Sequence, residues 1–388
     1  MKSDVAFICV GQAGGNIGSL FEERGYNVMY INTSLEDLSI LKNSTHKYHL
    51  KNGEGCAKDR DKAKQLLAED LEQLIDQIRV TITQKYVFVI FSSGGGTGSG
   101  VAPFLTEILI DEFKSKEEVA EDSLYKPEPE KYFAAVTIIP SDEDKTQAAV
   151  NSYNCCQELL DNEDLGSIFV LDNACGKDKL VINRIFVDAL DHILVIPSKY
   201  KHIEGNVDKA ELKRAIFETH GVAIANYLGR EKGNTALIAN AIRNNIYAPI
   251  QQDKVVLYYV TSTTSKIDME ALAQEFGEPV DVFSTYNQEC NLLLMTGLSF
   301  PYERFGEITD KVKARTATIE SSISTLHENR LNETLQISRN VRPKKSRTRV
   351  VTNKPQPGED GSVTTAAPAT MEIPKKSARD MLNSYRRR

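Results

Sequence analysis

The stretch FSSGGGTGSGVAP, residues 91–103, decides the fold of this chain. It places five glycines, a threonine and a serine between Gly94 and Gly100. An apolar run, residues 86–91, leads into it, and the helical pattern APFLTEILIDEFK follows. A glycine-rich turn between a parallel strand and a helix is typical of a phosphate cradle. Glycine lets backbone N–H groups point at an anion, and the helix adds its positive N-terminal end.

Two common nucleotide folds do not fit the pattern. A Walker P-loop needs GxxxxGK[ST], and no lysine stands in that place. A dinucleotide fold needs GxGxxG after the first strand and an acid about 20 residues on. The first loop, residues 11–18, reads GQAGGNIG, and the second strand ends in NTS. The alternative is a glycine turn with no ligand, but two such loops end neighbouring expected strands.

The first 200 residues alternate strand-like and helix-like segments, which predicts an α/β fold with a mostly parallel, doubly wound sheet. In such sheets, ligands bind beyond the carboxyl ends of the strands, where every unusual loop of this sequence lies. After residue 200 the pattern favours a smaller α/β region, with strands at 253–263 and 291–300 around a helix at 267–276. In the first part, strands are expected at 4–10, 27–33, 86–93, 133–140 and 167–173, and helices at about 15–25 and 58–80.

Composition narrows the class of protein. The 41% hydrophobic and 26% charged content is typical of a globular protein, and no apolar run is long enough to cross a membrane. The N-terminus lacks the features of a signal peptide, so we expect a cytoplasmic protein. The six cysteines form no CxxC and the six histidines no HExxH, so we expect reduced thiols and no zinc or other protein-built metal site.

The charge is unevenly distributed along the chain. Residues 336–388 hold 13 Lys or Arg and four Asp or Glu, which gives this segment a net charge of +9. Because the whole chain has a net charge of −7, residues 1–335 have a net charge of −16. The segment is rich in Pro, Ser, Thr and Lys, which is typical of a flexible tail. An acidic body with a basic tail suggests that the tail has its own partner.

The motifs together resemble the tubulin/FtsZ superfamily. GGGTGSG looks like its signature, and GQAGGNIG is similar to tubulin's GQAGNQIG. INTS, residues 31–34, resembles the VNTD of FtsZ, and GEGCAKDR, residues 53–60, takes the place of the family's third loop. The resemblance covers roughly residues 4–300. It implies a GTP-binding domain at 1–177, a central helix and connection at 178–203 and a second α/β (activation) domain at 204–300. The stretch that follows has no Gly after Gly306 and no Pro after Pro301, which predicts a long helix at 301–338 before a flexible basic tail at 339–388.

The same resemblance implies a site for GTP or GDP with Mg²⁺. The first loop would lie against the phosphates, the glycine loop would wrap them, and the third loop would sit near the γ-phosphate. Amides suit the guanine edge because they both donate and accept hydrogen bonds; alternatively, each amide is a cap or a solvated side chain. The implied set is Gly11, Gln12, Ala13, Gly14, Gly15, Asn32, Gly55, Cys56, Ala57, Gly94, Gly95, Gly96, Thr97, Gly98, Asp142 and Glu143, with Asn16, Asn173 and Asn183 as candidates for the base.

A later stretch, EGNVDKAELKRAI at 204–216, is similar to NVDFADV of FtsZ and NVDLTEF of α-tubulin. In the superfamily this loop projects into the nucleotide site of the next subunit. The resemblance therefore implies that Asn206, Asp208 and Glu211 are catalytic, with the two carboxylates orienting an attacking water. The alternative is that the acids only suit the dipole of a helix N-terminus.

Within the superfamily, the size, the INTS loop, the long helix and the basic tail look most like TubZ, the bacterial plasmid- and phage-borne homologues of tubulin that move DNA. This implies a GTPase that forms head-to-tail filaments and whose tail contacts a DNA-bound adaptor protein. Direct contact of the tail with DNA, an acidic membrane surface and a merely solubilising tail are alternatives, of which the membrane is not expected. A structural or positioning filament without a role in DNA partition is the alternative function.

Overall fold

A computed structural model describes residues 1–41, 44–117, 127–230, 235–249 and 256–328. The described residues up to Arg315 form one compact unit, and the last of them, 316–328, continue helix α10 (Tyr302–Glu328). Most of the predicted long helix is therefore observed. The predicted basic tail, 339–388, lies outside the described residues.

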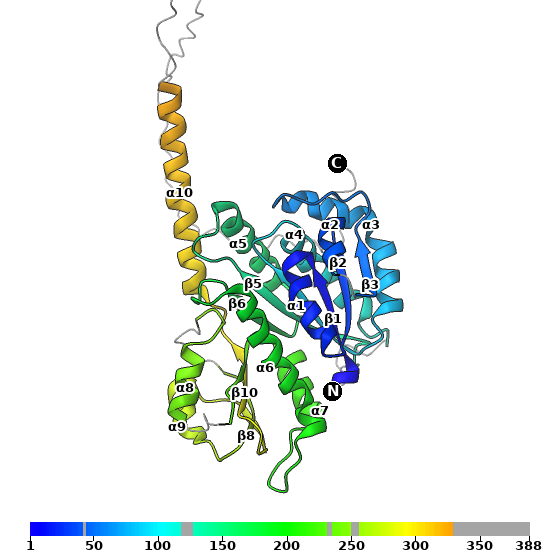
Figure 1. Ribbon diagram of the computed structural model, residues 1–388, viewed down its shortest axis with the longest axis vertical. Coiled ribbons are helices and arrows are strands. Elements are labelled where there is room, and N and C mark those ends of the chain that lie inside the picture. Colours follow the sequence, from blue (N-terminus) through cyan, green and yellow to red (C-terminus); the bar gives the residue numbers. More distant parts are fainter. Residues whose placement is uncertain (42–43, 118–126, 231–234, 250–255, 329–388) are drawn as a thin grey trace, which may run out of the picture. The chain divides into compact units, whose positions relative to one another are not determined.

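The predicted α/β class is confirmed by a sheet in which ten described strands follow the order β3-β2-β1-β4-β5-β6-β7-β10-β8-β9 (Figure 1). The first seven strands of this order run parallel to one another, and β10 is antiparallel to both β7 and β8. The strands are β1 (Val5–Val10), β2 (Asn27–Asn32), β3 (His46–His49), β4 (Tyr86–Ser92), β5 (Tyr132–Ile139), β6 (Ser167–Asp172), β7 (Gly221–Tyr227), β8 (Tyr258–Thr263), β9 (Asp281–Tyr286) and β10 (Leu292–Leu298).

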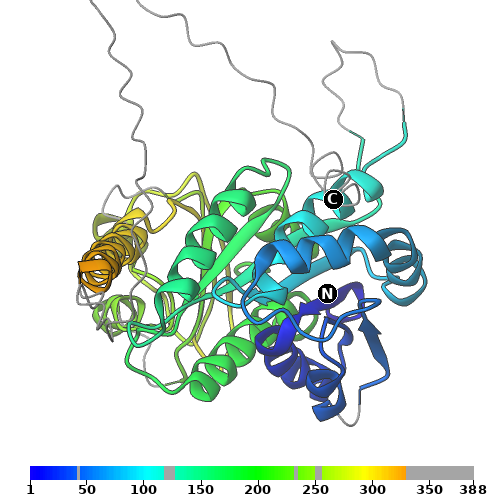
Figure 2. The same cartoon turned by 90° about the horizontal axis from the view of Figure 1, so that it is seen from above.

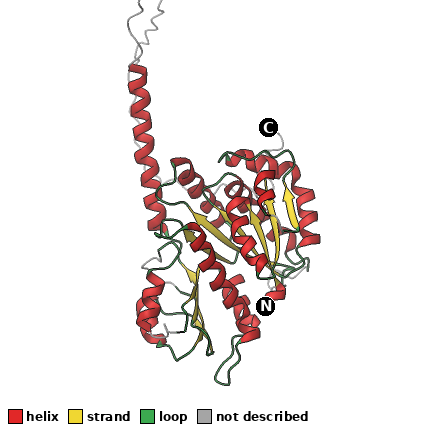
Figure 3. Cartoon of the chain, in the orientation of Figure 1, coloured by secondary structure: helices red, strands yellow, loops and turns green. Residues whose placement is uncertain are grey.

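Helices cover both faces of the parallel part of the sheet. Helices α1 and α6 pack together on one face, and α3, α4 and α5 pack together on the other (Figures 2 and 3). No helix within the described ranges is both long and apolar enough to span a membrane. The remaining bounds are α1 (Gly11–Glu23), α2 (Leu35–Ile40), α3 (Arg60–Thr81), α4 (Thr97–Phe113), α5 (Thr146–Leu160), α6 (Lys179–Lys199), α7 (Lys209–Phe217), α8 (Thr235–Arg243) and α9 (Met269–Phe276).

Phenylalanines fill the core between the sheet and the face that carries α1 and α6. The rings of Phe7 on β1 and Phe21 on α1 stack with centroids 3.9 Å apart. Phe88 on β4 meets Phe217 of α7 edge-on at 5.1 Å, so α7 joins the same face. Buried aromatic side chains remove large apolar areas from water, and this packing fixes α1 and α6 to the sheet.

The ends of β1 and β4 position the candidate site. The two strands are adjacent and parallel. The chain leaves β1 toward β2 on one side, and it leaves β4 toward β5 on the other. This is the topological switch point of the sheet, where loops diverge and leave a crevice beyond the carboxyl ends of the strands.

Some elements differ from the prediction. The first helix begins at Gly11 rather than near residue 15, so the first glycine loop is itself the first turn of α1. Strand β3 was not predicted because HKYH is polar and lies at the edge of the sheet. Strands β7 and β9 and helix α8 were also missed. Strands β6 and β7 pair at only two positions, and the domain division of the second half stays a prediction.

Candidate functional site

A cavity of about 410 Å³ lies at the switch point. Four segments of the chain line it: the start of α1, the turn after β2 with the start of α2, the loop that precedes α3, and the glycine loop before α4. A volume of this size is typical of a small-ligand site. The lining residues are Val10, Gly11, Gln12, Ala13, Ser34, Asp37, Gly55, Cys56, Ala57, Lys58, Ser92, Gly95, Gly96, Thr97 and Gly98.

Two helices begin at this cavity. Helix α1 begins at Gly11 and α4 begins at Thr97, and both residues line the cavity. The first N–H groups of a helix have no partner within the helix, and the helix dipole makes that end positive. Among the lining residues Lys58 is the one cation and Asp37 the one acid. The arrangement suits an anion such as a chain of phosphates.

The glycines of the motif serve two purposes. A Cβ at Gly96 would lie 2.9 Å from the Cβ of Cys56, and one at Gly98 would lie 3.0 Å from the carbonyl oxygen of Ser92. These two glycines therefore let neighbouring segments of the protein close on the motif. At Gly95 a Cβ would meet nothing nearer than 4.0 Å, so this backbone faces open space in the cavity.

The loop between β3 and α3 has an unusual backbone. Gly55, Ala57 and Lys58 have φ angles of 78°, 45° and 65°. This region favours glycine, so Ala57 and Lys58 hold a conformation that the surroundings must enforce. One restraint is a hydrogen bond from the Gly55 N–H to the carbonyl oxygen of Thr33, 2.8 Å long. Such restrained loops occur often at functional sites.

Thr33, in the turn after β2, connects the glycine loop to the loop before α3, and the sequence did not reveal it. Its hydroxyl lies 2.7 Å from the hydroxyl of Thr97, and it accepts a weak hydrogen bond from the thiol of Cys56 at 3.4 Å. Asn32, which was predicted instead, lies outside the cavity. Its amide oxygen accepts the backbone N–H of Thr33 and of Ser34, and its amide nitrogen donates to Asp37. The amide of Asn32 thus shapes the turn after β2.

Three predicted glycines lie beside the cavity rather than on its lining. A Cβ at Gly14 would lie 2.3 Å from the carbonyl oxygen of Ile90, so Gly14 lets α1 pack closely on β4. Gly15 packs near Leu41, and Gly94 packs near Ala148 of α5. Close packing thus requires a glycine at Gly14, whereas a Cβ at Gly15 would make only an ordinary contact with Leu41, 3.5 Å away.

None of the three asparagines expected at the base lines this cavity, but Asn16 lines a smaller cavity that shares Gly11, Gln12 and Asp37 with it. Asn183 is on α6 and is 9% exposed, and its amide makes no hydrogen bond to the described residues. Asn16 is exposed on α1, which packs against α6. Asn173 is half-buried directly after β6. Buried amides normally have partners, so Asn183 leaves hydrogen-bonding capacity for a ligand.

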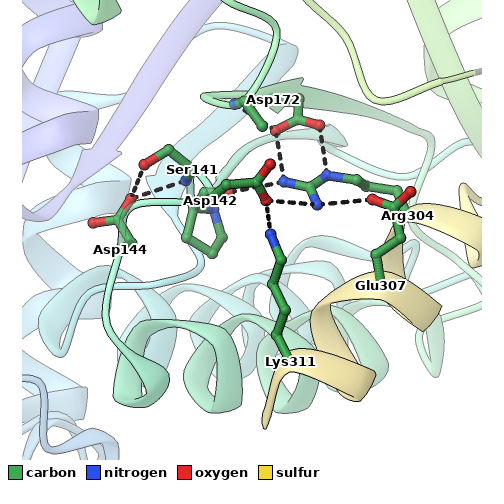
Figure 4. Close-up of polar contacts among 9 residues, drawn as sticks. Ser141, Asp142, Asp144, Asp172, Arg304, Glu307 and Lys311 are labelled. Carbon is green, nitrogen blue, oxygen red and sulfur yellow. Dashed lines mark hydrogen bonds and ion pairs between the residues drawn. The ribbon is translucent and has the colours of Figure 1, made fainter. Parts of the chain in front are cut away.

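The structure places Asp142 and Glu143 against the last helix rather than on the cavity lining. The carboxylate of Asp142 accepts hydrogen bonds from Arg304, at 3.3 Å, and from Lys311, both on α10 (Figure 4). The bond from Lys311 holds the pKa of Asp142 below its usual range. Glu143 is exposed, and both residues line a separate cavity between the β5–α5 loop and α10. Asp142 therefore joins the loop after β5 to α10.

Arg304 lies at the centre of this contact and was missed by the sequence analysis. Its side chain is 5% exposed, and its Nε atom lies 2.8 Å from the carboxylate of Asp172, which is also buried at the end of β6. It also pairs with Glu307, at 3.0 Å. The start of α10 is thus fixed to the carboxyl ends of β5 and β6.

The predicted catalytic residues lie at the other end of the sheet. Lys209, which follows Asp208, pairs at 2.7 Å with Asp4, just before the amino end of β1. The cavity begins at the carboxyl end of β1, roughly 20 Å away for a six-residue strand. Helix α6, which has 21 residues and a length of about 30 Å, precedes this loop. The carboxylates of Asp208 and Glu211 therefore do not reach the cavity of their own chain.

Asp208 and Glu211 form a capping box at the start of α7. The carboxylate of Asp208 accepts the Glu211 N–H at 2.8 Å, and the carboxylate of Glu211 accepts the Asp208 N–H at 2.8 Å. The side-chain oxygen of Asn206 accepts the N–H of His202. Each carboxylate uses one oxygen in the cap and keeps its second oxygen free of protein partners in the described residues. Burial raises the pKa of Glu211.

Comparison with known proteins shows which proteins this chain resembles. Residues 4–175 match the family model described as Tubulin/FtsZ family, GTPase domain. The chain is 28% identical over 338 residues to the tubulin-like protein TubZ of Clostridium botulinum C phage, which covers 84% of this chain and 89% of that protein.

Solved structures show the same fold. The crystal structure of Clostridium botulinum phage c-st TubZ matches 82% of this chain and all of its own with a TM-score of 0.71 at 24% identity. A GTPγS-form protofilament of Bacillus thuringiensis serovar israelensis TubZ matches 84% of this chain and 94% of its own with a TM-score of 0.68 at 16% identity. Residues 4–175 thus match the GTPase domain of the tubulin/FtsZ family, in a chain that is similar to TubZ along most of its length.

Proposed function

We propose that this chain binds GTP in the cavity at the switch point and hydrolyses it only where two subunits meet head to tail in a filament. The carrying observation is that the cavity and the acids of the α7 capping box lie at opposite ends of one sheet. Neither subunit alone then holds a complete hydrolytic site. A relative of this chain forms a GTPγS-form protofilament, which supports assembly.

GTP fits the residues that are present. The phosphates would lie against the first turns of α1 and α4, where Gly11, Gln12, Ala13 and the backbone from Gly95 to Gly98 offer N–H groups. The loop from Gly55 to Ala57 would lie against the terminal phosphate. Asn183, with its unpaired amide, would contact guanine together with Asn16 or Asn173.

Magnesium would accompany the phosphates. No three His, Cys, Asp or Glu side chains of the described ranges gather to hold a metal ion. Mg²⁺ usually keeps several waters and binds nucleotide phosphates together with one or two protein groups. The ion would therefore be held mainly by the nucleotide and water, where it would offset negative charge on the phosphates.

The acids of the next subunit would act on a water molecule. The second oxygen of Asp208 and that of Glu211 can each accept a hydrogen bond from water while the capping box stays intact. Burial favours the protonated form of Glu211, so its pKa moves toward the range of a useful base. The capping box would also fix both carboxylates in position before assembly.

In this proposal, the basic tail would attach the filament to its cargo. Residues 336–388 carry a net charge of +9 and would bind an adaptor protein on plasmid or phage DNA. Direct binding to DNA would be strongly salt-dependent. A positioning or scaffolding filament without such cargo is the second candidate, and deletion of the tail separates the two.

The substitution Glu211→Gln tests the shared site. Glutamine keeps the capping box because it can also accept the N–H of Asp208, but it cannot take a proton from water. We expect assembly into persistent polymer with hydrolysis reduced by about 10²-fold or more, a typical effect of losing a general base. Light scattering and phosphate release, followed together with GTP and Mg²⁺ at several protein concentrations, would measure both.

The two roles of the acids give different outcomes. If Asp208 and Glu211 only cap α7, Glu211→Gln would hydrolyse GTP like the wild type, and Glu211→Ala would be destabilised by about 0.5–2 kcal/mol. Wild-type hydrolysis without any concentration threshold would contradict the shared site. Failure of the wild type to bind GTP at all would contradict the proposal as a whole.

A further inference from the structure

Asn151, in the middle of α5, connects two walls of the cavity. Its side chain is almost fully buried, at 2% exposure. The amide nitrogen donates to the carbonyl oxygen of Lys58 at 2.9 Å and to that of Gly95 at 2.8 Å. The amide oxygen accepts from Gln147 at 2.9 Å. Both donor hydrogens of one planar amide are thus committed to the backbone of two different loops.

Those two loops are distant in the sequence, so the connectivity of the chain does not fix the distance between them. Lys58 ends the loop before α3, and Gly95 belongs to the glycine loop before α4, 37 positions further along the chain. They approach closely, since a Cβ at Gly96 would lie 3.0 Å from the Cα of Lys58. Asn151 approaches from a third element and fixes the spacing of the two carbonyl groups.

Lys58, which accepts one of the two hydrogen bonds from Asn151, has a strained backbone conformation. Lys58 has a φ of 65° and follows Ala57 at 45°, two consecutive left-handed residues that are not glycine. A conformation of this kind persists only where neighbouring groups enforce it. On the described chain, the amide of Asn151 is the side-chain group that bonds the Lys58 carbonyl.

Other contacts of α5 hold helices rather than this loop. Arg60, at the start of α3, donates to the carbonyl oxygen of Ser99 at 2.9 Å and pairs with Glu158 of α5. Lys64 pairs with the same carboxylate at 2.7 Å. These bonds fix α3 and α4 relative to α5. Asn151 instead bonds the backbone of Lys58 and Gly95, two residues that line the cavity.

We propose that Asn151 is a positioning residue that holds the loop 55–58 and the glycine loop at the spacing that a terminal phosphate requires. The inference rests on the proposed function, in which the loop 55–58 lies against that phosphate. Asn151 does not touch the nucleotide itself. Its loss should release the strained loop, so the triphosphate should lose affinity while the diphosphate, held by α1 and α4, should lose little.

The test compares GTPγS and GDP binding by isothermal titration calorimetry on the full-length chain. Asn151→Leu keeps a similar volume without donors, and Asn151→Ala removes the amide with less steric risk. We expect both variants to bind GTPγS about tenfold or more weakly, since a lost hydrogen bond of about 1.4 kcal/mol corresponds to tenfold. GDP affinity should stay within about threefold, a difference below 1 kcal/mol.

Gln147→Ala is the matched control, because it removes the hydrogen bond on the amide oxygen of Asn151 and leaves both bonds to the loops. It should bind both nucleotides like the wild type. An equal loss for GTPγS and GDP, unchanged GTPγS affinity, or loss of the folded state in both Asn151 variants by circular dichroism would overturn the positioning role. A wild-type chain that binds neither nucleotide would instead overturn the proposed function.

Discussion

Single glycines in the motif differ in what surrounds them, although the sequence repeats them without distinction. Gly96, Gly98 and Gly100 stand where other parts of the chain press on the backbone; at Gly100 a Cβ would lie 2.7 Å from the carbonyl oxygen of Arg60. Gly95 stands where the cavity is open. Gly96, Gly98 and Gly100 are therefore required for close packing of the folded chain, whereas Gly95 leaves space for a ligand in the cavity.

Alanine substitutions should separate these roles. Gly96→Ala would force its methyl group onto Cys56 and Lys58, so we expect a loss of unfolding free energy of about 1–3 kcal/mol, as for other overpacked sites. Gly95→Ala should change stability by less than about 0.5 kcal/mol and should weaken GTP binding, because the methyl group takes ligand space. Urea unfolding without nucleotide and calorimetry with GTP would measure the two effects. Equal destabilisation by both substitutions would contradict this division.

Sequence patterns revealed residues that act within one local segment, and they missed those that act across the fold. The motifs placed Gly11, Gly95 and Thr97 in one site because each belongs to a short loop of known chemistry. Thr33 and Asn151 carry no such signal. Their partners come from segments that are distant in the sequence, so their roles depend on the packed structure.

Helix α10 itself was predicted from the sequence, but its attachment to the sheet was not. Its length was expected from the absence of Gly and Pro, but the sequence analysis assigned no role to Arg304 or Lys311. The structure buries Arg304 against Asp172 and leaves Lys311 half-exposed beside Asp142. One charge of α10 therefore lies in the protein interior and the other at its surface.

The two charges should differ strongly in their effect on stability. Arg304→Met would leave the carboxylate of Asp172 buried without its partner, so we expect a loss of about 3–5 kcal/mol. Lys311→Met, which breaks an exposed pair on the same helix, should cost at most about 1 kcal/mol. Urea unfolding curves of the two variants and the wild type would give both values. Similar values for both would show that the Arg304 pair is solvated rather than buried.

For the other elements, the success of the prediction followed the clarity of the apolar pattern in the sequence. The apolar spacing of three and four residues in α3 was clear, and α3 is found at Arg60–Thr81 with its leucines buried. It begins after Asp59, whose carboxylate caps the helix by accepting the N–H groups of residues 61 and 62. Strand β9, with the alternating and mostly polar sequence DVFSTY, lies at the sheet edge and lacked the continuous apolar run that marked the central strands.

At the scale of the molecule, the direction of one sheet explains the proposed assembly. The seven parallel strands, in the sheet order β3-β2-β1-β4-β5-β6-β7, point their carboxyl ends toward the edge that holds the cavity. Asp208 and Glu211, at the start of α7, lie at the opposite, amino-terminal edge. Contact between the two opposite edges of successive subunits is heterologous, and such a contact builds an open filament when the rotation between subunits does not close a ring. In the proposed function, hydrolysis would follow assembly because the two halves of the site lie at opposite edges of the sheet.

The last prediction concerns the basic tail. Removal of residues 336–388 deletes a net charge of +9 and no residue of the cavity or of the α7 capping box. GTP hydrolysis and assembly should therefore stay within about twofold of the wild type, a change below 0.5 kcal/mol. Pelleting of polymer with and without the tail, in the presence of a candidate adaptor on its DNA, would measure cargo binding, which should be lost. Adding salt from 50 to 200 mM would distinguish direct phosphate contacts, which weaken steeply. If truncation abolished assembly instead, the tail would be part of the filament contact and the cargo role would fail.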